Sequence, residues 1–170
     1  MWRLQTRVKT VFILIKKGRY KNMKRNEKRY HEVIGNKVAS VYIQEFYLPK
    51  AQTFDDGTNT ITTSYYENIG VCVSNSRRTN NDWWNGDKSG NRLYNKSTGT
   101  ASTFMEIVDT LTVHVLEFCI KYGYYCCVFT PTDSHRRKVY MSVLKHVCKK
   151  CNLTYRYVLC DDDEIMVWIE

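Results

Sequence analysis

The spacing of apolar residues in the second half of the chain predicts two helices and three strands. Apolar residues recur at helical intervals over 102–122, where Thr103 and Glu106 fit a capping box and Gly123 ends the helix. A second helix is expected over 134–150. Between them, residues 124–129 form a continuous apolar run, which is typical of a strand buried on both faces. Residues 153–159 and 164–169 are joined by three aspartates and predict an antiparallel hairpin.

The first half of the chain has fewer elements that can be recognised. Residues 38–48 are rich in β-branched and aromatic residues and predict a strand that Pro49 stops. Residues 60–74 predict another strand, and the polar stretch 75–98 predicts a long loop. The order of elements indicates an α/β (α+β) fold: a mixed, largely antiparallel sheet flanked by two main helices.

Positive charge is concentrated at the N-terminus. Residues 1–37 contain twelve Lys or Arg and two acids, whereas the remaining residues contain fourteen Lys or Arg and fifteen acids. We therefore divide the chain into a basic N-terminal arm, 1–37, and a single α/β domain, 38–170. The arm interleaves cations with tyrosines, which suits nucleic acid or an acidic partner, but a solvated tail or an arm that contacts a neighbouring subunit fits equally well. The candidate contacts are Lys16, Lys17, Arg19, Lys21, Lys24, Arg25, Lys28 and Arg29.

The seven cysteines favour a reducing, intracellular compartment. Their number is odd and most lie within apolar runs, so we expect free core thiols and no metal. The alternative is a zinc site at His146, Cys148 and Cys151, which supplies suitable ligand types but no second Cys pair. The longest early apolar run, 11–15, is too short to cross a bilayer, so no membrane contact is expected.

The segment before the first predicted helix carries the main candidate for ligand chemistry. Its small residues, Lys96-Ser-Thr-Gly99-Thr100-Ala101, would let backbone N–H groups approach a phosphate, although such residues are also common at ordinary helix starts. Together with the elements that follow, this segment resembles the GNAT acetyltransferase family. The resemblance implies that acetyl-CoA binds at Lys96, Gly99, Thr100 and Ala101, and that Tyr140 is a general acid. The spacing of Tyr140 with its apolar neighbours Val139, Val143 and Leu144 favours instead a core tyrosine on an apolar helix face. The family's Gly-Phe turn is absent, and Cys151-Asn152-Leu153 stands in its place.

The helix sequence Arg136-Arg-Lys-Val-Tyr140 also resembles small proteins of tailed phages, and the abundance of Asn, Lys and Tyr is typical of an AT-rich genome. These features favour a non-catalytic structural or accessory protein of phage assembly. Its GNAT-like sheet would be a scaffold without a cofactor, its partners would be other proteins of the assembly, and its location would be the host cytoplasm or the virion. The alternatives are an acetyl-CoA-dependent N-acetyltransferase and a nucleic-acid-binding module acting through the arm. The sequence does not decide whether the chain is an enzyme.

Overall fold

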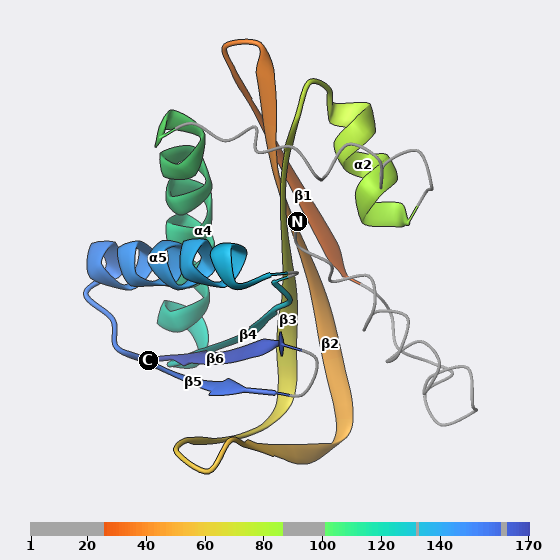
Figure 1. Cartoon of the computed structure of the whole chain (residues 1–170). Coiled ribbons are helices and arrows are strands. Elements are labelled where there is room, and N and C mark those ends of the chain that lie inside the picture. The colour runs from red at the N-terminus through yellow and green to blue at the C-terminus, as the bar shows by residue number, and fades with distance from the viewer. Residues whose placement is uncertain (1–25, 87–100, 132, 161–162) are drawn as a thin grey trace.

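The computed structural model describes residues 26–86, 101–131, 133–160 and 163–170. These residues form a six-stranded sheet with three helices (Figure 1). The strands are β1 (Glu27–Ile34), β2 (Lys37–Asp55), β3 (Thr60–Ser74), β4 (Tyr125–Phe129), β5 (Tyr155–Leu159) and β6 (Ile165–Ile169). The helices are α2 (Arg77–Asn85), α4 (Ala101–Tyr122) and α5 (Ser134–Cys151).

The strand order in the sheet is β1-β2-β3-β4-β6-β5. All neighbouring strands are antiparallel except β3 and β4, which are parallel and are paired only through Glu67 with Cys127 and Asn68 with Val128. Parallel neighbours need a crossover connection, and the chain between β3 and β4 contains α4. The mixed, largely antiparallel sheet with two main helices confirms the expected fold class.

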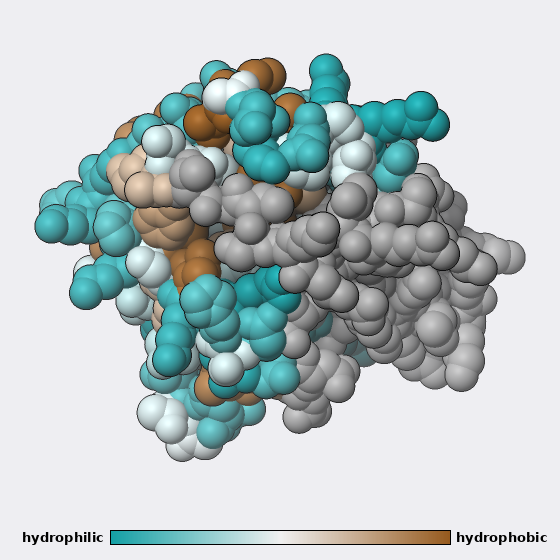
Figure 2. Space-filling model, turned by 45° about the horizontal axis from the view of Figure 1, so that its top comes forward, coloured by the Kyte–Doolittle hydropathy of each residue, from teal (hydrophilic) through white to brown (hydrophobic). Residues whose placement is uncertain are grey.

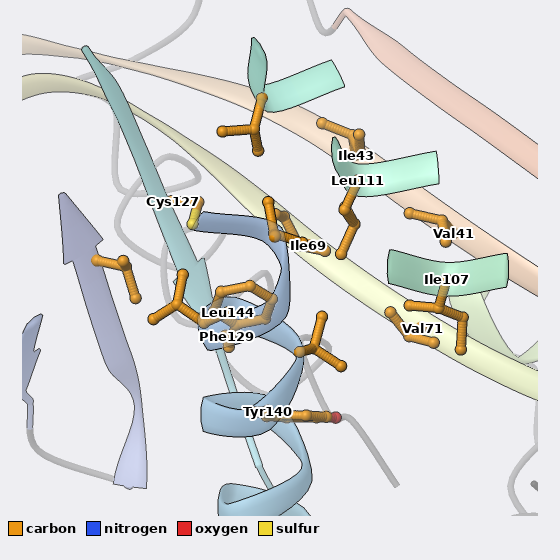
Figure 3. Close-up of a cluster of buried hydrophobic side chains, with 14 of the residues drawn as sticks. Val41, Ile43, Ile69, Val71, Ile107, Leu111, Cys127, Phe129, Tyr140 and Leu144 are labelled. Atoms are coloured by element: carbon orange, nitrogen blue, oxygen red, sulfur yellow. The ribbon is translucent and has the colours of Figure 1, made fainter. Parts of the chain in front are cut away.

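The sheet is covered on both faces. α4 and α5 lie on one face, and α2 lies on the other (Figure 1). Successive strand residues point to opposite faces, so Val41 faces Ile107 of α4 (Figure 3), whereas Tyr42 stacks on Trp84 of α2 with ring centroids 4.9 Å apart. The main hydrophobic core therefore joins all three helices to the sheet.

A second hydrophobic cluster lies where the β2–β3 hairpin meets β4, β5 and β6. The prediction that Pro49 stops its strand was wrong, because β2 continues to Asp55 past a register shift between Tyr47 and Gln52. Proline is tolerated at such an irregularity because a bulged position need not donate to the ladder. Phe46, which precedes the bulge, and Ile61, which is paired with the strand beyond it, both pack in this second cluster.

Three other expectations from the sequence need correction. Residues 27–34 form β1, so part of the predicted arm belongs to the sheet, and the boundary at residues 37 and 38 falls within the start of β2. The predicted loop over 75–98 contains α2. Thr103 is buried inside α4, which begins by Ala101, so Thr103 is not an N-cap.

No helix in the described part of the chain is long and apolar enough to cross a membrane. The coloured residues in Figure 2 are mostly hydrophilic, with hydrophobic residues gathered in small tracts between polar ones. On a surface of this kind, places where several apolar side chains are exposed together are candidates for contacts with other molecules.

Candidate functional site

The predicted phosphate loop lies almost entirely outside the described residues. Lys96, Gly99 and Thr100 belong to the stretch 87–100, whose structure is not described, and Ala101 is the exposed first residue of α4. The binding of acetyl-CoA at this loop therefore stays a prediction.

Most of the basic contacts predicted for the arm also lie outside the described residues, namely Lys16, Lys17, Arg19, Lys21, Lys24 and Arg25. The two that are described lie on β1, where Lys28 is exposed. The guanidinium of Arg29 donates to Asn85 Oδ1 at 3.1 Å, forms an ion pair with Glu27 and lies 5.8 Å from the ring centroid of Tyr42. Arg29 therefore helps to hold α2 against the sheet.

Tyr140, the predicted general acid, is buried on α5. Its ring centroid lies 5.8 Å from that of Phe129 at the end of β4, and Leu144 lies one turn further along the helix (Figure 3). The side chain thus belongs to the core beside the region where β3 and β4 part. That position agrees with a core role and leaves the proposed acid role untested.

The residues of the alternative zinc site do not converge. His146 is exposed, and its Nδ1 lies 2.8 Å from the carbonyl oxygen of Ser142 one turn earlier. Burial raises the pKa of the Cys148 thiol to about 12, which disfavours the thiolate that a metal requires. None of the seven cysteines forms a disulfide, and no group of three or more metal-binding side chains occurs in the described part of the chain.

A buried carboxylate that the sequence did not reveal lies at the point where β3 meets β4. Glu67 is only 1% exposed, and its two oxygens accept hydrogen bonds from Tyr65, Tyr125 and His114. The donor–acceptor distances from Tyr65 and His114 are both 2.8 Å. Burial alone would raise the pKa of Glu67, but these hydrogen bonds and the electrostatic interaction with His114 hold that pKa below its ordinary value. The network connects β3, β4 and α4 in the core.

The helix α2 is the second feature that sequence analysis missed. Ser76 accepts a hydrogen bond from the backbone N–H of Thr79 and begins the helix, and Gly86 ends it with a left-handed backbone conformation. Trp83 is fully buried against the sheet. A capping serine and a terminal glycine with nine residues between them were the signal that could have predicted it.

The exposed face of α4 is the third such feature, and it is the strongest candidate for a functional surface. Val113 is 59% exposed and Ile120 is 78% exposed. Met105 and Leu116 are also exposed. These four apolar residues lie along one line of the helix at successive intervals of eight, three and four residues, and we call them the α4 stripe. The sequence carried a signal for it, because apolar residues occur around most of this helix.

Polar residues border the α4 stripe. Asp109 interrupts it and forms an ion pair with Lys150 of α5. Glu106, Glu117 and Lys121 are exposed along one flank. An apolar line with charged borders is the usual composition of a protein-binding surface. No protein-family model, no curated protein and no solved structure matches this chain.

Proposed function

We propose that this chain is a structural or accessory protein that self-associates, with the sheet as a scaffold and the α4 stripe as the contact between copies. The observation that carries the proposal is the exposure of Val113, Leu116 and Ile120 along one line of a helix whose opposite face is already buried in the core. Full burial of such a side chain contributes about 1.5–3 kcal/mol. A surface of this size suits a weak dimer, since association must also offset lost translational and rotational freedom.

The distribution of charge along α4 favours a second copy as the occupant. Glu106 and Lys121 are fifteen residues apart, which is about 22 Å along a helix that rises 1.5 Å per residue. Their midpoint lies at Val113 and His114, close to the midpoint of the stripe from Met105 to Ile120. A second α4 in antiparallel orientation, centred between Val113 and His114, would therefore place the two stripes against each other and Glu106 of each copy near Lys121 of the other.

Sedimentation equilibrium of the full chain tests this proposal. The wild type is expected to show a monomer–dimer equilibrium in the micromolar range or weaker, and Ile120→Asp is expected to be monomeric because it buries an unpaired charge in the contact. Val33→Asp is the matched control, since Val33 is 71% exposed but lies on β1, away from the stripe. A wild type that stays monomeric at all concentrations, or equal losses in both variants, would contradict the proposal.

A phage assembly is the setting we propose for this self-association. The resemblance of Arg136–Tyr140 to proteins of tailed phages and the AT-rich composition support it. An oligomer built from one repeated contact is also a common feature of symmetric assemblies.

An acetyl-CoA-dependent N-acetyltransferase is the second candidate. The resemblance of the segment that begins at Lys96, and of the elements that follow it, to the GNAT family supports this candidate. If the chain binds acetyl-CoA, the cofactor should raise the melting temperature by mass action, and Gly99→Asp should remove that rise. Tyr140→Phe should keep the thermal shift and lose acetyl transfer. Absence of any shift at millimolar acetyl-CoA would eliminate this candidate.

A further inference from the structure

A pocket of about 290 Å³ lies between the edge strand β1 and the N-terminal half of α4. Its floor is apolar and is formed by Ala39, Val41 and Ile107, which are all buried. Its walls carry Tyr30 and Glu32 from β1, and Glu106 and Thr110 from α4.

The strand register explains why these side chains surround one space. Tyr30 is paired with Val41, and Glu32 is paired with Ala39. Paired residues of antiparallel strands project to the same face of the sheet, so Tyr30 and Glu32 lie on the face that α4 covers. Glu106 lies one turn before Thr110 on α4. The pocket therefore has a carboxylate on each side, an aromatic ring and an apolar base.

The charge of this pocket is negative. Neither Glu32 nor Glu106 forms an ion pair with any residue in the described ranges. Arg29 and His31 also border the pocket, but their side chains make their hydrogen bonds on the opposite face, Arg29 with Asn85 of α2 and His31 with Ser40 at 2.7 Å. An anion would meet two carboxylates here, whereas a cation would be attracted to them.

We infer that this pocket binds a primary alkylammonium group. Methylene groups would pack on Ala39, Val41 and Ile107, and the ammonium would lie between Glu32 and Glu106. The Tyr30 ring adds the attraction of an aromatic face for a cation. A lysine side chain has this chemistry, since its apolar stem can be buried while its charged end reaches polar groups.

Lys121 of a second copy is the source of this group that the fold favours, a point that rests on the proposed self-association. In the antiparallel arrangement centred between Val113 and His114, Lys121 of one copy comes level with Glu106 of the other. A free alkylamine is the other source of the same chemistry, and the two can be separated experimentally.

The first arm uses the full chain carrying Ile120→Asp, so that the pocket is free of a second copy. Calorimetric titration with 1,5-diaminopentane should show binding that weakens with salt, and 1,5-pentanediol, which has the same carbon chain without charge, should not bind. Glu32→Gln in that background should weaken amine binding at least fivefold, whereas Glu117→Gln, which changes an exposed carboxylate of α4 outside the pocket, should leave it unchanged. Absence of amine binding, or equal effects of the two variants, would overturn the inference.

The second arm tests the source by sedimentation. If Lys121 enters the pocket, Lys121→Gln and Glu32→Gln should each weaken the dimer, and the double variant should be hardly weaker than either single one. Additive effects, or no effect of Lys121→Gln, would overturn the assignment to Lys121. A wild type that remains monomeric would contradict the proposed function, while the amine titration would still show whether the pocket binds an alkylammonium group.

Discussion

Replacing Glu67 by glutamine should destabilise the fold without changing its shape. The amide has nearly the same size as the carboxylate, but it carries no charge and offers one acceptor oxygen where Glu67 offers two. At present Tyr65, Tyr125 and His114 all donate to this carboxylate. Burial, and then the charge of Glu67, raises the pKa of both tyrosines, so both phenols stay protonated as donors.

The magnitude follows from the difference between charged and neutral hydrogen bonds. A bond to a charged group contributes about 1.5–3 kcal/mol and a neutral bond about 0.5–1.5 kcal/mol. The Tyr65 hydroxyl can turn to accept from the new amide, so the loss consists mainly of weaker bonds from Tyr125 and His114. We expect Glu67→Gln to lower the free energy of unfolding by about 2–3 kcal/mol.

Urea denaturation measures this effect. With a slope of about 2 kcal/mol per molar urea, the transition midpoint should fall by about 1 M while the slope stays constant. Glu117→Gln is the control, since Glu117 lies on the exposed side of α4 and its change should stay within about 0.5 kcal/mol. A Glu67→Gln protein as stable as this control would refute the view that the network stabilises the fold.

The same pair of proteins predicts a dependence on pH. The pKa of Glu67 lies below its ordinary value of 4.5, so its carboxylate contributes stability above that value and loses it as pH falls through the lower, folded-state pKa. The gap in stability between wild type and Glu67→Gln should therefore be constant from neutral pH to about 4.5 and shrink below that. A gap that widens in acid would contradict the direction of the shift.

Three further predictions concern stability and reactivity. Trp83→Ala should cost about 3–5 kcal/mol in urea denaturation, because Trp83 is fully buried between α2 and the sheet. With a disulfide reagent on the native protein, Cys151 and Cys160 should react before the five buried thiols, since the reaction needs an accessible thiolate. Removal of residues 1–34 should unfold the chain at moderate temperature, because β1 pairs with β2 at eight positions. Removal of residues 1–25 should preserve the melting temperature, and it should abolish any salt-sensitive binding of nucleic acid through the arm.

The helices α4 and α5 and the β5–β6 hairpin could be predicted because local signals agreed with the periodicity. Gly123 ends α4 with a left-handed backbone, and Asp133 accepts a hydrogen bond from the backbone N–H of Arg136 at the start of α5. β1 could not be predicted in the same way. An edge strand needs no apolar face along its full length, and its charged residues discourage pairing with other chains. Four of the eight residues of β1 are charged, so its sequence does not indicate a strand.

The candidate functional features depend on contacts between residues that are distant in the sequence, which a single sequence does not show. Glu67 and His114 are 47 residues apart, and the crossover from β3 through α4 brings them together. The pocket at β1 arises from the register of Tyr30 with Val41 and from the position of Glu106. The α4 stripe had a local signal, because apolar residues occur around most of that helix.

Cross-linking at position 113 tests the central claim, self-association through antiparallel α4 helices, most directly. Val113 lies at the centre of the proposed contact, and packed helices are 8–10 Å apart between axes, so Val113→Cys on the two copies should be joined rapidly by a short bis-maleimide. Val33→Cys lies on β1 at a position that is even more exposed than Val113, and it should cross-link no faster than wild type, whose own seven cysteines set the background. Concentration-dependent dimers from Val113→Cys that disappear when Ile120→Asp is added are the predicted result. Equal cross-linking at positions 113 and 33, or dimers that survive Ile120→Asp, would contradict the account.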